Sequence, residues 1–518
     1  MHTYARSPST YALYRWLKRK GEIIKLTRRN ILKTSVLSGA AILAGTSQAT
    51  PVNAPAKWDA TYDVVIIGAG GGGMMAAHYA AEKGLKPVVL EKLAFPGGSS
   101  AVCGGQLSIA DSPIQREKGI KDSEELFKKE MLKVGQNKND PALVEAHIKS
   151  IREVFNFIHN TLGARPKSVN AVSGMSVPRA HLYYPPSKLL TQIFTYVKDQ
   201  QGVPFLFNTP AERLIWDEGR IVGVRARKGS EVLYIRALKG VIIASGGFQY
   251  SKELMGKYNP LMAKVTPAGC KGNTGDGLKM AQAYGADVLD TNYIKATFGY
   301  QLGNYPDSVH CYYAGAIIVN HEGKRFVNES KSYKLLSDAA LAQPDEYTFQ
   351  LFDENIRNRR IKEHPRNAMV LNNEFLNAGK DAPFCFCGAT LEEVAKKAGV
   401  NVENLKETVA KYNSDIEMNG KDSVFGRDSL TSGFGKPLKI EKGPFFLYPT
   451  KPRCIATYCG LRIDANARVI DVFGEAIPGL YACGEATGGV HGAAYMTGTA
   501  LGKAFSFGRL AALDIANS

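Results

Sequence analysis

Three observations predict a two-domain α/β fold for this chain. Residues 63–67 form a short, almost wholly apolar run, and a glycine-rich turn and a helix-favouring segment follow it at once. A second glycine-rich segment, 484–492, follows another apolar run near the C-terminus. The 518 residues are too many for one ordinary core. We therefore expect a Rossmann-like domain that is discontinuous in sequence and carries an inserted α+β capping domain.

The first apolar run and its turn have the context of a dinucleotide-binding site. Asp63–Ile67 is typical of a central parallel strand, and residues 74–83 favour a helix that ends at Gly84. Pro87–Leu90 predicts a second parallel strand, which leads directly to Glu91. A strand, a glycine-rich turn, a helix and a following acidic residue together predict a nucleotide site much more strongly than glycines alone.

Each glycine of the turn has an expected physical role. Gly68 would permit the tight turn, Gly70 would let the backbone approach a pyrophosphate, and Gly73 would let helix and strand pack closely. The helix N-terminus would offer N–H groups and partial positive charge to the phosphates. Glu91 would accept a hydrogen bond from a ribose hydroxyl.

The C-terminal segment indicates that the nucleotide is FAD. Residues 477–485 predict a strand that closes on Gly484 and Glu485, and residues 499–512 favour a helix. FAD is long, so its isoalloxazine ring needs contacts that are distant in sequence from the pyrophosphate loop. The second glycine-rich segment is suited to supply them.

Four short segments stand in the order of one known family: Gly97–Ser100, Val241–Gly247, Thr274–Gly277 and 484–489. They resemble the fumarate reductase/succinate dehydrogenase flavoproteins and their relatives, the 3-ketosteroid dehydrogenases. The likeness covers nearly everything from residue 60 to 518. It implies one FAD, which we expect to be non-covalent because no histidine stands beside Gly97–Ser100.

Carried over residue by residue, the resemblance puts Glu91 on the adenosine ribose and Glu485 on the ribityl chain. The helix start at Thr499, with Ala500 and Leu501, would point at the pyrimidine end of the flavin. A helix N-terminus there would stabilise the negative charge of reduced flavin near N1. The same resemblance places the remaining flavin-binding residues at Gly98, Ser99, Ser100, Gly104, Gly105, Gly247, Asp276 and Gly484.

The domain boundaries follow from flavin contacts at both ends of the chain. We expect the FAD-binding domain to comprise 58–290 and 446–518, and the capping domain to comprise 291–445. The capping domain would open with a strand pair around 315–320 and 324–328. Residues 419–444, rich in Gly and Ser, are typical of a loop.

The active-site positions depart from those of a fumarate reductase, which holds two carboxylates with arginines and histidines. The proton-donor position is Tyr333, and the second arginine position is Tyr495. The His-His-Thr stretch reads Ile455–Thr457, and the remaining histidine position is Thr297. These four departures argue against a small dicarboxylate substrate.

The replacements resemble the 3-ketosteroid dehydrogenase pattern instead. There, one tyrosine exchanges a proton with the substrate, while a second tyrosine and a glycine N–H polarise the ketone. The resemblance assigns these roles to Tyr333, Tyr495 and Gly498, although the Tyr495–Gly498 spacing is one residue shorter than in that pattern. It implies hydride transfer between flavin N5 and a carbon–carbon bond conjugated to a carbonyl of a small molecule.

Two other functions remain open from the sequence. A fumarate- or acrylate-type reductase of periplasmic anaerobic respiration could bind its carboxylate through Lys295 or Lys331. A flavoprotein electron carrier would turn over no substrate. His491 suits a structural or a catalytic role, and Arg325 is expected to form a local ion pair. Because no haem or iron–sulfur motif is present, electrons would pass to or from a separate partner such as a periplasmic cytochrome.

The spacing of the cysteines and the distribution of charge argue against a metal site and against nucleic-acid binding. The eight cysteines lack metal-ligand spacing, so we expect no metal site and mostly buried free thiols. Residues 1–49 hold nine Lys/Arg and one acidic residue, so this short segment carries +8 of the net charge of +17 and the rest of the chain carries +9. Elsewhere no basic run is interleaved with aromatic residues, which argues against nucleic-acid binding.

The basic N-terminus is interpreted as a twin-arginine signal peptide over residues 1–49. Arg28 and Arg29 precede a modestly apolar segment, 34–45, and Ser47–Ala49 offers a small-residue cleavage site. The apolar segment is shorter than the ~20 residues that span a bilayer, so we expect a periplasmic protein without a membrane span.

Export should therefore require both guanidinium groups of the arginine pair. Replacing Arg28 and Arg29 together by Lys keeps the positive charge and removes the receptor's recognition element. Cell fractionation of the double variant should show the protein retained in the cytoplasm. Unchanged periplasmic accumulation would contradict the twin-arginine assignment.

Overall fold

The computed structural model describes residues 52–518 except 173, 295, 302–307, 346, 364–366, 369, 373–384 and 431–434. The expected signal peptide and the candidate carboxylate ligand Lys295 therefore lie outside the described residues. In the described part, no helix combines the length and the apolarity that crossing a membrane requires. All eight cysteines are free thiols, and four of them are buried.

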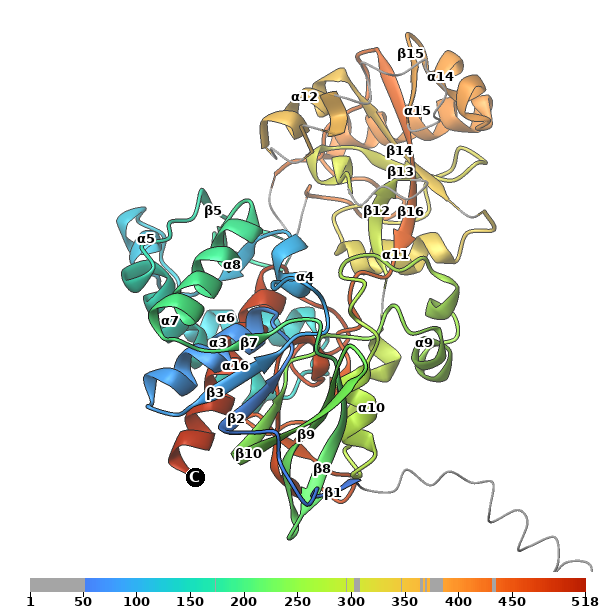
Figure 1. Cartoon of the computed structure of the whole chain (residues 1–518). Coiled ribbons are helices and arrows are strands. Elements are labelled where there is room, and N and C mark those ends of the chain that lie inside the picture. The colour runs from blue at the N-terminus through green and yellow to red at the C-terminus, as the bar shows by residue number, and fades with distance from the viewer. Residues whose placement is uncertain are drawn as a thin grey trace, which may run out of the picture. The chain divides into compact units, whose positions relative to one another are not determined.

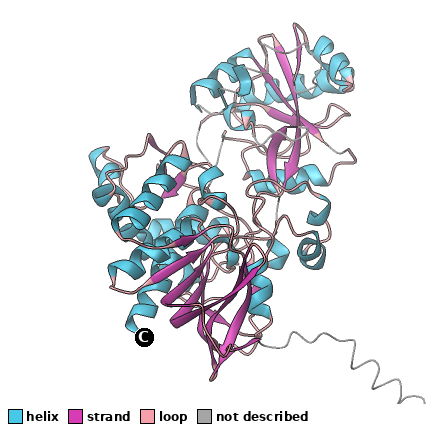
Figure 2. Ribbon diagram, viewed as in Figure 1, coloured by secondary structure: helices cyan, strands magenta, loops and turns pink. Residues whose placement is uncertain are grey.

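A nine-stranded mixed sheet forms the centre of the nucleotide-binding part (Figure 1, Figure 2). Its order is β1-β8-β9-β10-β2-β3-β7, and β19 joins it by pairing with both β10 and β18. The strands β10, β2, β3 and β7 run parallel, as does β19 on β10. The bounds are β1 Val52–Asn53, β2 Ala60–Ile67, β3 Pro87–Leu90, β7 Phe205–Leu206, β8 Ala211–Asp217, β9 Arg220–Lys228, β10 Glu231–Ile243, β18 Arg468–Ile470 and β19 Ala476–Ala482.

The helices of this part pack on the sheet and on one another, and α16 lies along α3. The strand–turn–helix unit is as expected, because β2 and β3 pair in parallel and α3 lies between them in sequence. The bounds are α3 Gly71–Glu82, α4 Gly98–Val102, α5 Pro113–Glu117, α6 Glu124–Val134, α7 Pro141–Asn156, α8 Pro186–Thr195, α9 Lys252–Tyr258, α10 Asp276–Gln282 and α16 Thr499–Asn517.

Two smaller sheets complete this part. A three-stranded sheet has the order β4-β6-β5, and a two-stranded sheet pairs β11 with β17. The bounds are β4 Gln106–Ser108, β5 Ser168–Asn170, β6 Ala180–Leu182, β11 Val288–Leu289 and β17 Gly460–Leu461.

A five-stranded antiparallel sheet forms the core of the capping region (Figure 1). Its order is β12-β16-β14-β13, with β15 also paired to β16. The bounds are β12 Thr297–Gln301, β13 Ile317–Val319, β14 Thr348–Asp353, β15 Phe386–Gly388 and β16 Phe445–Arg453. The helices described here are α11 Tyr333–Leu341, α12 Glu354–Glu363, α14 Leu391–Ala398 and α15 Val402–Asn419.

The capping region differs from its expected outline at two places. Strand β16 belongs to the capping sheet, so the chain leaves that sheet after Arg453 rather than at the expected 446. The expected strand pair at 315–328 is reduced to β13 and a single bridge between Val319 and Arg325. Of residues 420–444, those that the structure describes contain no helix or strand, as expected.

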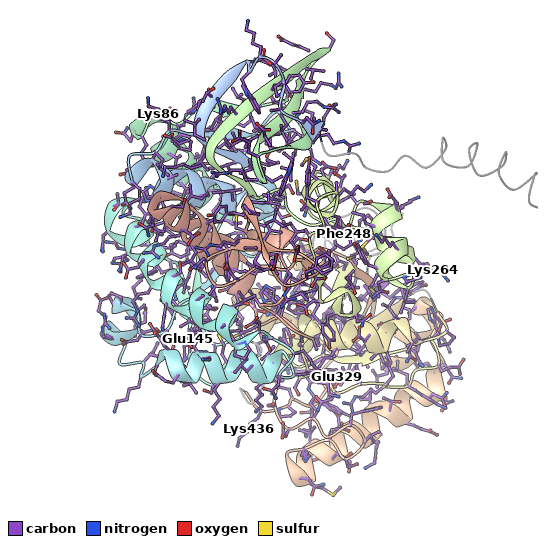
Figure 3. The ribbon with its side chains drawn as sticks, turned by 90° about the horizontal axis from the view of Figure 1, so that it is seen from below. Lys86, Glu145, Phe248, Lys264, Glu329 and Lys436 are labelled. Atoms are coloured by element: carbon purple, nitrogen blue, oxygen red, sulfur yellow. The ribbon has the colours of Figure 1, made fainter. Side chains whose placement is uncertain are left out.

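A buried ion network holds the segment that leads to Tyr333. Arg325 pairs with Glu329 and Asp422, each at 2.7 Å, which confirms its expected local ion pair. The Arg427 guanidinium donates to the Ala316 carbonyl at 2.9 Å. Glu329 lies among the capping elements in Figure 3, whereas the exposed Lys86 and Lys264 lie at the periphery. Removing one member of such a buried network leaves an uncompensated charge, so the network fixes this segment.

The glycine-rich turn shows why two of its glycines serve different purposes. A side chain on Gly73 would collide with the carbonyl oxygen of Gly68, so helix α3 can approach the turn only without a Cβ there. A Cβ on Gly70 would meet nothing within 4 Å, and the backbone φ of Gly70 is −77°, which any residue adopts. The open space beside Gly70 is therefore left for a ligand rather than for packing.

Alanine substitutions should separate these two roles. Gly73→Ala should destabilise the fold itself and lower the melting temperature of the cofactor-free protein, because the new Cβ collides with backbone. Gly70→Ala should leave that melting temperature unchanged and weaken FAD binding by about tenfold or more, since the methyl group occupies ligand space. Equal FAD affinity in Gly70→Ala and wild type, measured by flavin titration, would contradict this reading of the turn.

Candidate active site

One large cavity collects nearly all the residues that the sequence singled out. Its volume is about 1280 Å³, larger than the roughly 300–1,000 Å³ typical of a small-molecule site. It extends from the β2–α3 turn to residues of the capping region, including Tyr333 and Arg360. The expected site residues that line it are Gly68, Gly70, Glu91, Gly98, Ser99, Ser100, Gly104, Gly105, Asp276, Gly484, Glu485, Tyr495, Ala500 and Leu501.

The turn end of the cavity has the features of a nucleotide site. The first N–H groups of α3 face Ser100, whose Oγ accepts from the Gly71 N–H at 3.2 Å. Glu91 follows β3 and is buried, and its oxygens accept from the Ala69 and Leu93 N–H groups, each at 2.8 Å. These contacts fix the Glu91 carboxylate at the cavity wall, where it can still accept from a ribose hydroxyl. Asp276 forms an ion pair with Lys92 at 2.6 Å.

The flavin end of the cavity is organised around the carboxylate of Glu485. Its oxygens accept from the Thr457 N–H at 2.9 Å and from the Asn273 amide at 3.1 Å. Burial raises the pKa of Glu485, and these hydrogen bonds oppose that rise. Gly247 packs directly against this carboxylate and not on the cavity, because a Cβ there would collide with Glu485 Oε1. Asn273 also donates to Ser99 Oγ at 3.0 Å, which links the network to α4.

The start of α16 closes this end as expected. Helix α16 begins at Thr499, Gly498 is its N-cap with φ of +91°, and Ala500 and Leu501 line the cavity. The glycine-rich turn leaves open space beside Gly70. The N-terminus of α16 and the carboxylates of Glu91 and Glu485 line the rest of the cavity. These residues fit a bound FAD.

The two expected catalytic tyrosines meet although they are far apart in sequence. Tyr333 is the first residue of α11, and its hydroxyl lies 3.3 Å from Thr497 Oγ1. The rings of Tyr333 and Tyr495 have centroids 6.3 Å apart. The Gly498 N–H donates to the Tyr495 hydroxyl at 3.3 Å, so this donor is directed at the phenol rather than into the cavity. Gly498 thus orients Tyr495 in this structure.

Burial keeps the acid–base groups of the pocket neutral. It raises the pKa of Tyr333 well above 10, and the neighbouring tyrosines Tyr495 and Tyr458 raise it further. Burial likewise raises the pKa of Tyr495 and lowers that of His491 well below 6.5. At neutral pH the pocket therefore presents phenol O–H donors and an uncharged imidazole.

Two residues of the cavity wall and one buried residue beside it were not found from the sequence. Tyr458 stacks on Tyr495, with centroids 4.9 Å apart and planes 13° from parallel. His310 stacks on Tyr333 at 5.8 Å. Lys334 is buried, donates to Thr297 Oγ1 at 2.7 Å and lies 4.7 Å from the Tyr458 ring centroid. A lysine at a helix start is normally a surface residue, so only tertiary packing reveals this cation.

The other residues that the sequence singled out differ in whether they line the cavity. Ile455 and Ala456 line the cavity, where apolar side chains stand in place of histidines. His491 also lines it and sits edge-on to Tyr458 and Tyr495. Lys331 is exposed and is not one of the residues that line the cavity. In the described residues, no cluster of three His, Cys, Asp or Glu side chains is arranged to hold a metal ion.

Comparison with known proteins agrees with this geometry. The family model for the FAD binding domain matches residues 63–501. A fumarate reductase (cytochrome) from Shewanella frigidimarina is 32% identical over 463 residues, which cover 88% of this chain and 77% of the relative. A urocanate reductase from Eggerthella lenta is 30% identical over 481 residues, which cover 89% of this chain and 76% of the relative.

Solved structures show the same fold. The 3-ketosteroid-Δ4-(5α)-dehydrogenase from Rhodococcus jostii RHA1, in complex with 4-androstene-3,17-dione, superimposes with a TM-score of 0.74. Its sequence is 25% identical, and the match covers 90% of this chain and 100% of that chain. Both expected branches of the resemblance are thus present among the relatives. The chain belongs to the FAD binding domain family and is an FAD-dependent oxidoreductase that acts on CH–CH groups.

Proposed function

We propose that this enzyme acts on a carbon–carbon bond conjugated to a neutral carbonyl, as in an enone. The observation that carries the proposal is the pair of buried phenols, Tyr333 and Tyr495, at the positions where the resemblance to fumarate reductases leads one to expect arginines. A phenol O–H can bind a ketone oxygen without an unpaired guanidinium in a largely apolar pocket. The FAD, bound non-covalently, supplies hydride exchange at its N5.

Tyr333 is the proposed proton donor and acceptor at the carbon α to the carbonyl. Tyr333 lines the cavity, its hydroxyl lies near Thr497 Oγ1, and its ring stacks on His310. Its raised pKa means that it keeps its proton until a strongly basic carbon develops beside it.

Tyr495 is the proposed ligand of the carbonyl oxygen. Its ring stacks on Tyr458 and contacts His491 edge-on, and the Gly498 N–H donates to its oxygen at 3.3 Å. Because that N–H polarises the phenol, Tyr495 becomes a better donor toward negative charge on the substrate oxygen. The buried cation of Lys334 adds a favourable field for the same charge.

A reductase of α,β-unsaturated carboxylates is the second candidate, and the sequence relatives favour it. Fumarate reductase and urocanate reductase are both named among proteins at least 30% identical to this chain. Such a substrate would need a cation at its reacting carboxylate. Of the cations near the phenol pair, Lys334 donates to Thr297 Oγ1 and lies beside the Tyr458 ring, and it is not among the residues that line the cavity. Phenols at the positions where the resemblance leads one to expect arginines favour the neutral carbonyl.

We further propose that the enzyme works outside the cytoplasm and exchanges electrons with a separate redox protein such as a cytochrome. The twin-arginine pattern at Arg28 and Arg29 supports the location. The lack of a haem or iron–sulfur motif in the sequence supports a separate partner.

Tyr333→Phe should lower turnover of an enone by roughly 100-fold or more, the usual weight of a positioned proton donor, with little change in FAD content. Tyr495→Phe should lower turnover by a smaller factor, because the Gly498 N–H that binds the phenol is then released to hold the oxygen. Tyr183→Phe is the matched control, since its buried hydroxyl has no partner in the described structure and is not in the cavity wall.

The measurement is steady-state oxidation of a reduced dye with a panel of enones and with fumarate. Wild type should turn over one or more enones faster than fumarate. Efficient fumarate reduction, or a Tyr333→Phe enzyme as fast as the Tyr183→Phe control, would overturn the proposed assignment.

A further inference from the structure

The guanidinium of Arg360, on the capping helix α12, lines the same cavity and has no role in the proposed reaction. Arg360 is 8% exposed and is among the residues that line the cavity. Its Nε donates to Asn367 Oδ1 at 2.6 Å. Within the part of the chain that the structure describes, its two terminal nitrogens have no hydrogen-bond or ion-pair partner.

The charged groups around Arg360 do not neutralise the positive charge of its guanidinium. Glu363 also lines the cavity, but it pairs with Arg359 at 2.6 Å. The other groups that face Arg360 are Cys311, Tyr312 and Tyr313, none of which carries charge at neutral pH. A guanidinium removed from water without a counter-ion costs several kcal/mol. An anion that entered the cavity would complete its environment.

Arg360 is connected to the proposed reaction centre by direct contacts. Asn367 Oδ1, which binds Arg360, also accepts from the His310 N–H at 3.4 Å, and the His310 ring stacks on Tyr333. The Tyr313 hydroxyl, near Arg360, accepts from the Tyr333 N–H at 3.1 Å. The phenol pair and the guanidinium thus belong to one continuous wall. A single small molecule can contact both.

We propose that Arg360 binds a carboxylate on the part of the substrate remote from the reacting carbonyl, and so determines specificity. The inference rests on the proposed function and deepens it: the substrate class is a carbonyl-conjugated alkene with an anionic tail. A planar guanidinium with two free donors suits a carboxylate, which it can bind bidentately. Tyr495 binds the neutral end and Arg360 the charged end, and this arrangement fixes the orientation of the molecule.

The probes are straight-chain trans-enones that end in a carboxylate, with tails of increasing length, and the methyl ester of each. Binding is read from the perturbation of the oxidised flavin spectrum, and turnover from reduced-dye oxidation. In wild type, at least one acid should bind about 30-fold or more tightly than its ester. Arg360→Met should abolish that preference and leave ester binding and ester turnover unchanged.

Arg357→Met is the matched control, because Arg357 lies on the same helix, is not among the residues that line the cavity and pairs with Glu354 at 3.4 Å. It should keep the preference for the acid within about threefold. Arg360→Lys keeps a cation without the planar fork, and should restore part of the preference. FAD content and the melting temperature verify that each variant is folded, and the acid-to-ester comparison in wild type needs no variant.

The outcomes distinguish this inference from the proposed function. If wild type binds every acid and ester pair alike, or if Arg360→Met weakens acid and ester equally, Arg360 is a structural residue and the inference fails. In either case a slow Tyr333→Phe enzyme on the esters would leave the proposed function intact. If wild type turns over neither acids nor esters, the proposed function itself fails.

Discussion

The buried carboxylate of Glu485 is the contact on which the rest of the site depends. Glu485 lies close to the C-terminus, yet its partners come from three other parts of the chain: Gly247 after β10, Asn273 before α10, and Thr457 after β16. A buried carboxylate needs hydrogen-bond donors, and here those donors are positioned by different elements. The network therefore fixes where the two sequence-distant halves of the flavin-binding part meet. The Thr457 contact also fixes where the chain re-enters from the capping sheet.

The positions of the two proposed catalytic tyrosines follow from this junction. The segment that continues from Glu485 carries His491, Tyr495 and the start of α16, while the segment before Thr457 is β16 of the capping sheet. Tyr333 approaches from the capping side through α11, whose preceding loop is held by Glu329 and its arginine partners. The ion network thus positions the helix that carries Tyr333, while the Gly498 N–H orients Tyr495 directly. The fold therefore positions Tyr333 and Tyr495 before a substrate binds.

Much of the fold was predictable because its signals are local. The strand at Pro87–Leu90 matches its expected bounds, and α16 begins at the expected Thr499. Helix α3 begins at Gly71, before the expected 74, because its first glycines already adopt helical backbone. Strand β16 was not predicted, and the expected boundary at 446 placed its residues in the FAD-binding domain. The prolines Pro449 and Pro452 disfavour a central strand, and only the pairing with β14 reveals it. Lys334 and Arg360 were missed because a charged side chain on a helix is ordinarily solvated, and burial of either depends on the assembled capping region.

In the proposed reaction the phenol pair, not a guanidinium, faces the reacting carbonyl. A crystal structure of the FAD-loaded enzyme with a saturated ketone product bound tests this arrangement. We expect the ketone oxygen within hydrogen-bond distance of the Tyr495 hydroxyl, and the α-carbon beside the Tyr333 hydroxyl, at roughly 3 Å. A carbonyl bound by Lys334, or a product whose α-carbon lies away from Tyr333, would contradict it.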